Sequence, residues 1–217
     1  MPHICRAFLL ARCNQQRGES NMEKQRKRTK YFVTIGMLSS IGFLLHLLNF
    51  PIPPFPAFLK VDFSDMPALL AVITMGPAAG ILVELFKNVL DWLFTGTETG
   101  VPVGHIANFT TGVLFIMPVY MVFNRFKSVS GLITGLIAGT LVMAVGMSFL
   151  NYAVFLPMYT YFLGMDQVVG DALYVMIIKG ILPFNIIKGI IITVIMVLLF
   201  KAMDKWIIQQ QKQYHYQ

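Results

Sequence analysis

Residues 130–162 read SGLITGLIAGTLVMAVGMSFLNYAVFLPMYTYF, a stretch without a single Asp, Glu, Lys or Arg. A helix needs about 20 apolar residues to cross the hydrocarbon core of a bilayer. The stretch is therefore long enough to span a membrane. Pro157 near its end predicts a kink, because proline cannot donate a backbone hydrogen bond.

The rest of the chain has the same apolar character. Hydrophobic residues make up 56% of its 217 residues, charged residues only 12%, and the mean hydropathy is +0.68. A soluble protein of this length has too little interior to hide so much apolar surface from water. The composition excludes soluble enzymes, disordered tails and disulfide-rich secreted domains, and it indicates that the bilayer is the solvent.

Five further apolar runs flank this stretch. We expect an all-α membrane protein, a six-transmembrane-helix bundle with a long Pro-rich outer loop at residues 51–65, called loop 1 below. Residues 66–75 are too few to span a bilayer alone. Residues 166–179 are expected to be a loop, with an interfacial helix as an alternative. The five runs are residues 31–50, 66–75, 77–94, 104–123 and 182–200.

The net charge of +7 is concentrated at the start of the chain. Residues 1–30 hold eight Lys/Arg and two Glu, a net charge of +6. This excess indicates an anchor rather than a nucleic-acid-binding face. Of the segments that flank membrane spans, those in the cytoplasm carry an excess of Lys and Arg. The basic turn at residues 124–127 and the basic residues after 200 belong to the same side, so both termini are predicted to be cytoplasmic.

These patterns divide the chain into three parts. Residues 1–30 are a basic polar leader, of which 1–21 are expected to be dispensable, since Met22 opens a basic run typical of the start of a membrane protein. Residues 31–203 form the membrane domain, and 204–217 a cytoplasmic tail. The predicted location is a cell membrane, which the chain crosses several times in contact with its lipids, with no nucleic acid as a partner.

Four polar side chains are predicted to lie in the outer half of the bundle, beneath loop 1. They come from three spans, and their shared depth favours a pocket open to the outside over isolated helix–helix contacts. Such a pocket, with many aromatic neighbours, suits a flat apolar ligand with a polar edge. The four residues are Asn108, Asn151, Asn185 and Lys188.

Glu84, Lys87 and Asp91 share one face of the 77–94 span. One interpretation is a network of ion pairs that satisfies itself inside the bundle. The other is a proton relay, which would make the chain a self-sufficient proton-coupled solute carrier. A lysine between two acids is already neutralised, which favours the first. A third hypothesis is an accessory scaffold without a ligand.

The sequence lacks the common motifs of nucleotide hydrolysis and zinc-dependent catalysis. The chain has no phosphate-binding GxxxxGKS/T loop and no HExxH zinc motif. His46 and His105 lie on different segments without metal-ligand spacing. We therefore expect no enzyme activity, no ATP hydrolysis by this chain, no resident cofactor and no metal.

Four short motifs, occurring in order, resemble the riboflavin-specific substrate-binding (S) component of energy-coupling factor (ECF) transporters. The resemblance covers roughly residues 30–203. The motifs are LKVDFSDMPAL at 59–69, GPAAG at 76–80, Asn108-Phe109 and PFNIIKG at 183–189.

The resemblance implies a vitamin-binding protein without catalysis. Riboflavin would enter from outside a pocket capped by loop 1. The chain would then associate with a transmembrane coupling protein and two ATPase subunits, topple in the membrane and release its ligand inside. The implied ligand contacts are Asn151, Asn185 and Lys188, with loop 1 contributing Lys60 and Asp62. The small-residue docking motif of the family would correspond to Gly36 and Ser40, where alanines are usual.

Overall fold

The computed structural model describes residues 2–56, 59–97, 100–163 and 170–215. Residue 1 of the predicted leader and residues 216–217 of the predicted tail lie outside this part. In chain order the elements are α1 (Pro2–Leu47), β1 (Phe50–Pro51), β2 (Lys60–Val61), α2 (Asp65–Met75), α3 (Pro77–Thr95), α4 (Val103–Phe126), α5 (Val129–Leu150), the π-helical η1 (Asn151–Phe155), α6 (Leu156–Leu163), α7 (Asp171–Val175), the π-helical η2 (Met176–Ile181) and α8 (Leu182–His215).

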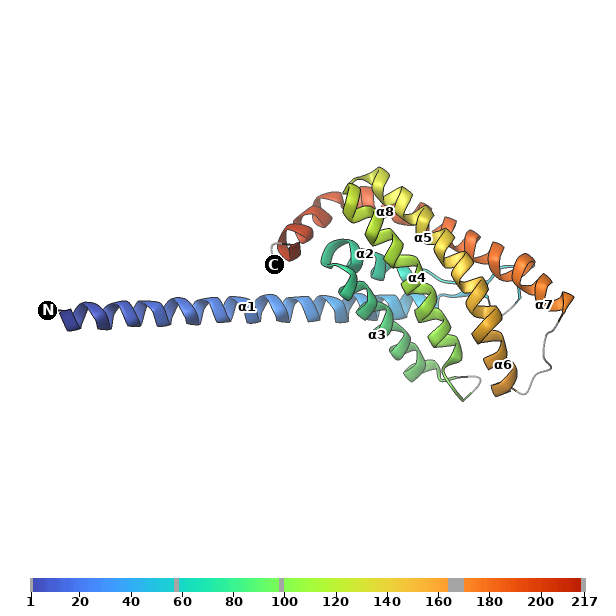
Figure 1. Cartoon of the computed structure of the whole chain (residues 1–217), viewed down its shortest axis with the longest axis horizontal. Helices are drawn as coiled ribbons and strands as arrows, with labels where there is room; N and C mark the ends of the chain where they lie inside the picture. Colours follow the sequence, from blue (N-terminus) through green and yellow to red (C-terminus); the bar gives the residue numbers. More distant parts are fainter. Residues whose placement is uncertain (1, 57–58, 98–99, 164–169, 216–217) are drawn as a thin grey trace.

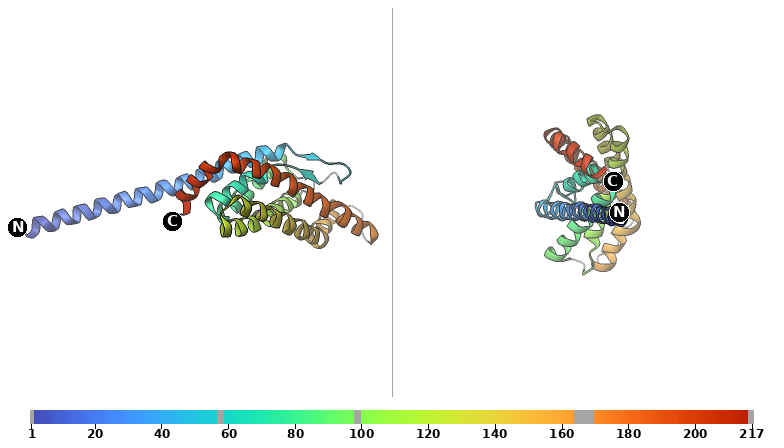
Figure 2. Two further views of the ribbon diagram at one scale, coloured as in Figure 1. Left: turned by 90° about the horizontal axis from the view of Figure 1, so that it is seen from above. Right: turned by 90° about the vertical axis from the view of Figure 1, so that its left-hand side faces the viewer.

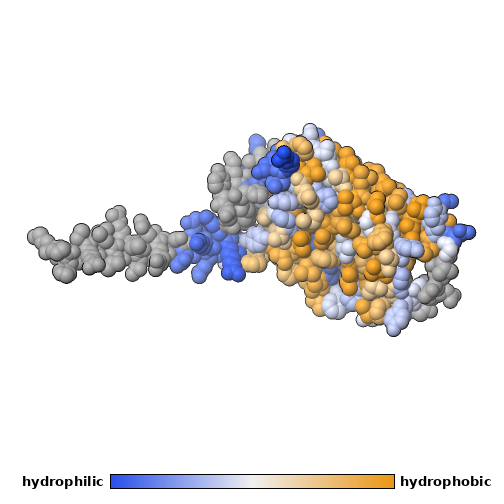
Figure 3. Space-filling model, in the orientation of Figure 1, coloured by the Kyte–Doolittle hydropathy of each residue, from blue (hydrophilic) through white to orange (hydrophobic). Residues whose placement is uncertain are grey.

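The chain is an all-α membrane protein apart from one small hairpin. Four helical segments are long and apolar enough to cross a membrane. Large apolar side chains such as Leu141, Val145 and Phe149 of α5 are exposed on the outside of the bundle, as expected of a surface that meets lipid. Figure 3 shows this apolar surface between two more hydrophilic ends. The four segments are Asn21–Leu47, Val103–Phe126, Val129–Phe162 and Asp171–Met203.

Helix α1 is a single long helix whose first half projects away from the bundle (Figures 1 and 2). It ends at Leu47, before the predicted end of the first span at residue 50. The chain then turns into the hairpin, in which Phe50 pairs with Val61 and Pro51 with Lys60. The prolines of loop 1 cannot continue a helix, so the hairpin supplies a different set of backbone hydrogen bonds.

Two helices change to π-helical geometry just before a proline. Segment η1 ends two residues before Pro157, and η2 ends two residues before Pro183. Proline offers no N–H to the carbonyl four residues earlier, and a local change of helical pitch is one way to accommodate the lost bond. The expected kink near Pro157 is thus a π-helical segment at residues 151–155.

The last helix begins earlier and ends later than the sequence pattern predicts. Residues 166–179 were expected to be a loop or an interfacial helix. Residues 171–181 are helical and run directly into α8, while 166–169 lie outside the described residues. Ile177 and Ile181 pack inward while Lys179 remains exposed, so one outward charge does not break the helix. At the other end α8 continues to His215, with Ile207 buried and Gln211 donating to the Ile73 carbonyl at 3.0 Å.

Glycines allow the central helices to approach closely. A Cβ added at Gly139 of α5 would lie 2.6 Å from the backbone oxygen of Phe115 in α4. At Gly189 of α8 it would collide with Thr140 of α5. These small residues bring α4, α5 and α8 together over the core, as expected for helices packed inside a membrane.

We expect Gly139→Ala to lower the free energy of unfolding by about 1–3 kcal/mol, because a backbone oxygen cannot move aside as a flexible side chain can. Gly36→Ala is the matched control, since a Cβ at Gly36 meets nothing within 4 Å. Thermal unfolding in detergent would measure both. Equal unfolding midpoints for the two variants would contradict the argument.

Candidate functional site

Lys188 of α8 is buried against loop 1. Its ammonium Nζ lies 3.4 Å from Oδ2 of Asp62 and 3.2 Å from Oδ2 of Asp65. All three residues are at most 3% exposed. The sequence analysis predicted Asp62 and Lys188 as site residues, and the structure brings them together across 126 positions of sequence. Loop 1 is therefore tied to α8 by charge.

Aromatic and proline contacts fix the same loop on the same helix. The rings of Phe55 and Phe184 meet edge-on with centroids 5.6 Å apart. Pro56 lies beside Gly180, where an added Cβ would be in ordinary contact at 3.7 Å. Loop 1 thus covers the region where η2 passes into α8.

Lys87 of α3 continues the network inward. Its Nζ lies 2.5 Å from Oδ1 of Asp65 and 2.9 Å from Oε2 of Glu84, and it donates to Oγ of Ser64 at 2.8 Å. Lys87 is 1% exposed, and Asp65 and Glu84 are fully buried. A lone ammonium here would be very costly, so the surrounding acceptors are what keep this charge in the core.

Asp91 pairs with two histidines rather than with Lys87. Its Oδ2 lies 3.2 Å from Nε2 of His46 and 2.8 Å from Nδ1 of His105. The prediction that Glu84, Lys87 and Asp91 form one ladder is therefore correct only for the Glu84–Lys87 step. Asp91 lies one turn further along α3, at the level where α1 ends and α4 begins, and there the histidines are nearer.

Together these groups form a chain of alternating charge. His46 closes it, because its Nδ1 lies 3.6 Å from Oδ2 of Asp62. The order of contacts is His105, Asp91, His46, Asp62, Lys188, Asp65, Lys87 and Glu84.

The loop carboxylate at the centre of this chain is held in its charged form. Burial alone would raise the pKa of Asp62, but the neighbouring cations, Lys188 first, outweigh it and hold the pKa well below its usual range. Oδ1 of Asp62 accepts hydrogen bonds from both the backbone N–H and the hydroxyl of Ser64. The carboxylate is thus fixed on one side by its own loop, and its second oxygen faces Lys188 and His46.

The predicted asparagines are bound to their own helices. Asn151 donates to the Met147 carbonyl at 2.8 Å, and Asn185 donates to the Ile181 carbonyl at 2.9 Å. Both are buried beside the π-helical segments. An amide side chain also has an oxygen that accepts hydrogen bonds, so each asparagine can pair with a donor as well as an acceptor.

The other predicted site residues are placed differently. Asn108 of α4 donates to Oδ1 of Asn88 at 3.0 Å, which joins α4 to α3. Lys60 is exposed on β2. Gly36 and Ser40 of α1 are exposed, and the Ser40 hydroxyl donates to the Gly36 carbonyl at 2.9 Å. The last two lie on the outside of the bundle, where a partner protein could reach them.

Two histidines and one serine of the network were missed. His46 and His105 were considered only as metal ligands, for which the sequence spacing was wrong. Counting depth along each span would have placed both near the end of α3 that carries Asp91. Ser64 carries no such signal, because its role depends on the fold of loop 1.

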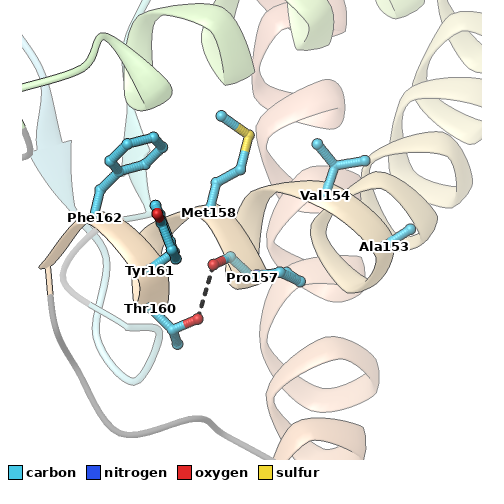
Figure 4. Close-up of a pocket in the computed structure, with 7 residues that line it drawn as sticks. All are labelled: Ala153, Val154, Pro157, Met158, Thr160, Tyr161 and Phe162. Atoms are coloured by element: carbon cyan, nitrogen blue, oxygen red, sulfur yellow. Dashed lines mark hydrogen bonds between the residues drawn. The ribbon is translucent and has the colours of Figure 1, made fainter.

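A shallow hollow of about 550 Å³ lies along η1 and α6 (Figure 4). It contains none of the predicted site residues. Figure 4 shows that its side chains come from one stretch of helix, with Thr160 donating to the Pro157 carbonyl at 2.8 Å. We place the candidate site at the buried network instead, because charges from several elements converge there. The hollow is lined by Ala153, Val154, Pro157, Met158, Thr160, Tyr161 and Phe162.

Comparison with known proteins finds a matching family model and relatives that are all described as transporters. A family model described as "ECF transporter, substrate-specific component" matches residues 30–200. The riboflavin transporter FmnP of Bacillus subtilis (strain 168) is 49% identical over 85% of this chain and 97% of its own. The riboflavin transporter RibU of Staphylococcus aureus (strain TCH60) is 44% identical over 83% of this chain and 94% of its own.

A solved structure has the same fold. It is described as "Structure and mechanism of the S component of a bacterial ECF transporter", with a TM-score of 0.71 and 42% identity. The similarity covers 82% of this chain and 98% of that one.

We expect Lys87→Met to lower the free energy of unfolding by about 3–5 kcal/mol, because it strands buried carboxylates without their cation. Adding Glu84→Gln should recover part of the loss, since Asp65 keeps Lys188. Thermal unfolding in detergent would measure both. Lys179→Met, at an exposed position, is the control and should change stability by no more than about 0.5 kcal/mol. A single variant as stable as the parent would show that the network is dispensable for folding.

Proposed function

This chain belongs to the family of substrate-specific components of ECF transporters, and we propose that it binds riboflavin from outside the cell and delivers it inward as part of an ATP-driven complex. It is a multi-pass protein of the cell membrane. One observation carries the proposal: relatives named as riboflavin transporters are 44% and 49% identical over nearly their whole lengths. At that identity we expect the same ligand.

The proposed topology has six crossings with both termini in the cytoplasm. The four long apolar helices would be joined by α3, which carries the buried charges, and by the short α2. The exposed basic residues 24–30 of α1 lie before the first crossing, as the positive-inside rule requires. The bond from Gln211 to Ile73 supports placing the tail and the end of α2 on one side.

The proposed ligand site lies beneath loop 1. Lys188, Asn185 and Asn151 would meet the polar edge of the flavin ring, since amides and an ammonium can match its C=O and N–H groups. Asp62 would orient Lys188 from above, while Lys60 and Asn108 would lie at the margin. The nearby Phe55 and Phe184 would offer apolar faces to the ring.

The proposed partners are a transmembrane coupling protein and two ATPase subunits. The chain has no phosphate-binding loop of its own, so energy from ATP must come from elsewhere. Gly36 and Ser40 on the exposed side of α1 would let a partner helix approach closely.

The comparisons do not favour a self-sufficient proton-coupled carrier. The relatives are named as riboflavin transporters and the family as one component of a larger transporter. Glu84, Lys87 and Asp91 would then serve the architecture of the site rather than a proton pathway. The relatives are likewise named as transporters and not enzymes, which is consistent with a protein without catalysis.

We expect the purified protein to carry a yellow, flavin-fluorescent ligand at about one per chain, or to take up added riboflavin. Asn185→Ala and Lys188→Ala should each weaken binding by about 1–3 kcal/mol, because a buried ligand group loses its partner. Quenching of intrinsic fluorescence would give the dissociation constants.

Two exposed residues serve as controls for these variants. Asn124→Ala and Lys179→Ala remove the same side-chain types from exposed positions and should leave affinity unchanged. Protein that is colourless and does not respond to riboflavin would refute the proposed ligand. Unchanged affinity in Asn185→Ala and Lys188→Ala would show that the site is elsewhere.

Replacing Gly36 and Ser40 together by Leu should abolish assembly with the coupling protein and leave riboflavin binding intact. The isolated chain has room for this change, since nothing lies within 4 Å of a Cβ at Gly36. Co-purification with the tagged coupling protein measures assembly. Leu at Ser130 and Thr134, an exposed pair with the same spacing on α5, is the matched control. Normal co-purification of the Gly36/Ser40 variant would refute the docking face.

A further inference from the structure

His46 occupies a bridging position that the proposed binding contacts do not use. It is the second-last residue of α1, directly before the chain turns into the hairpin and loop 1. One ring nitrogen, Nε2, lies 3.2 Å from Asp91 of α3, and the other, Nδ1, lies 3.6 Å from Asp62 of loop 1. A single imidazole thus connects loop 1 to the helix bundle on the side away from α8.

The bridge ends on the carboxylate oxygen that also faces Lys188. Oδ2 of Asp62 lies 3.4 Å from the Lys188 ammonium and 3.6 Å from the His46 ring. The other oxygen, Oδ1, is occupied by Ser64. Only Oδ2 of Asp62 is therefore left to face the helices, and it lies between His46 of α1 and Lys188 of α8. Moving His46 would change where Asp62 holds Lys188.

We propose that His46 is a positioning residue for the ligand site: its imidazolium ties loop 1 to α3 through Asp62 and Asp91, and thereby holds Asp62 against the Lys188 that meets the ligand. This inference rests on the proposed function, because Lys188 is there assigned to riboflavin. It adds a residue that does not touch the ligand and acts through loop 1.

The protonation state of His46 sets the strength of this tie. The 3.6 Å between Nδ1 and Oδ2 of Asp62 is too long for a hydrogen bond, so the attraction across it depends on the positive charge of the protonated imidazole. The charged groups that face it are Asp62 of loop 1 and Asp91 of α3. Beyond them lie His105 of α4 on Asp91, and Lys188 of α8 on Asp62. Losing the proton removes the positive charge that lies between Asp62 and Asp91, so raising the pH loosens loop 1 and weakens ligand binding.

The test compares His46→Gln with His105→Gln. Both histidines lie against Asp91, but only His46 also reaches Asp62. Riboflavin affinity would be measured from about pH 5.5 to about pH 9.5, a range that includes imidazole titration. We expect the parent to bind more weakly as the pH rises. His46→Gln should bind about tenfold more weakly at neutral pH and lose most of this pH dependence. His105→Gln should weaken binding less than His46→Gln does and should keep the pH dependence of the parent, because His105 does not reach Asp62.

A second measurement needs no ligand. Lys60 is the only Lys or Arg in loop 1, so tryptic cleavage after Lys60 reports whether the loop is held. Cleavage after Lys127, in the exposed turn between α4 and α5, is the internal reference. In the ligand-free protein, His46→Gln should speed cleavage at Lys60 and leave that at Lys127 unchanged. Asp91→Asn, which keeps His46 but removes its anchor on α3, should act in the same direction.

The outcomes separate this inference from the proposed function. Riboflavin binding by the parent, together with His46→Gln that matches the parent in affinity and in Lys60 cleavage, would overturn the role of His46 alone. Equal weakening by His46→Gln and His105→Gln would also overturn it, because the effect would then be general support of Asp91. If the parent does not bind riboflavin but His46→Gln is cleaved faster after Lys60, then riboflavin is refuted as the ligand. The link that His46 makes between loop 1 and α3 is in that case supported.

Discussion

The structure depends on how four buried carboxyl groups are paired with basic side chains inside a protein that spans a bilayer. Asp62, Asp65, Glu84 and Asp91 are all at most 5% exposed. Burying any one of these carboxylates without a partner would cost several kcal/mol. Removing one partner of a buried ion pair is strongly destabilising, because it leaves the other charge uncompensated. Here each lies beside Lys87, Lys188 or a histidine. Acidic and basic side chains alternate along this chain, and the surrounding helices must be placed so that each buried group keeps its partner.

The pairing of these buried groups fixes the helices and loop 1 relative to one another. The charged side chains come from α1, loop 1, α2, α3, α4 and α8, so a shift of any one helix would leave a buried charge without its partner. Apolar packing in a membrane supplies little orientation, because lipid is as apolar as the core. The network supplies it instead, while Gly139 and Gly189 set how closely the helices approach.

The same network connects loop 1 to the proposed ligand. A substrate-binding component must hold its ligand on one side of the membrane and later release it on the other. A lid held by ion pairs suits such a cycle, because its attachment depends on charges that a ligand's polar edge can meet or replace. The two π-helical segments lie close to this site, since Asn151 is the first residue of η1 and Asn185 follows η2 in α8.

The sequence by itself determined the class of the protein and much of its outline. Apolar runs give helices in a bilayer because a spanning chain must satisfy its own backbone, and the segments at 66–75, 77–94 and 104–123 match α2, α3 and α4 closely. The sequence also indicated that Asn185 and Lys188 are buried, since so few charges remain in the membrane domain. It did not join residues 171–179 to the last spanning helix, because a mixed segment with an outward lysine resembles a loop or an interfacial helix when its neighbours are not known. Only the tertiary structure decided which charges meet. Spacing along one helix put Asp91 with Lys87, whereas the ends of α1 and α4 bring His46 and His105 closer, and loop 1 folds back to bring Asp62 to Lys188. Pairing across helices depends on the register between them, and no pattern within a single helix specifies that register.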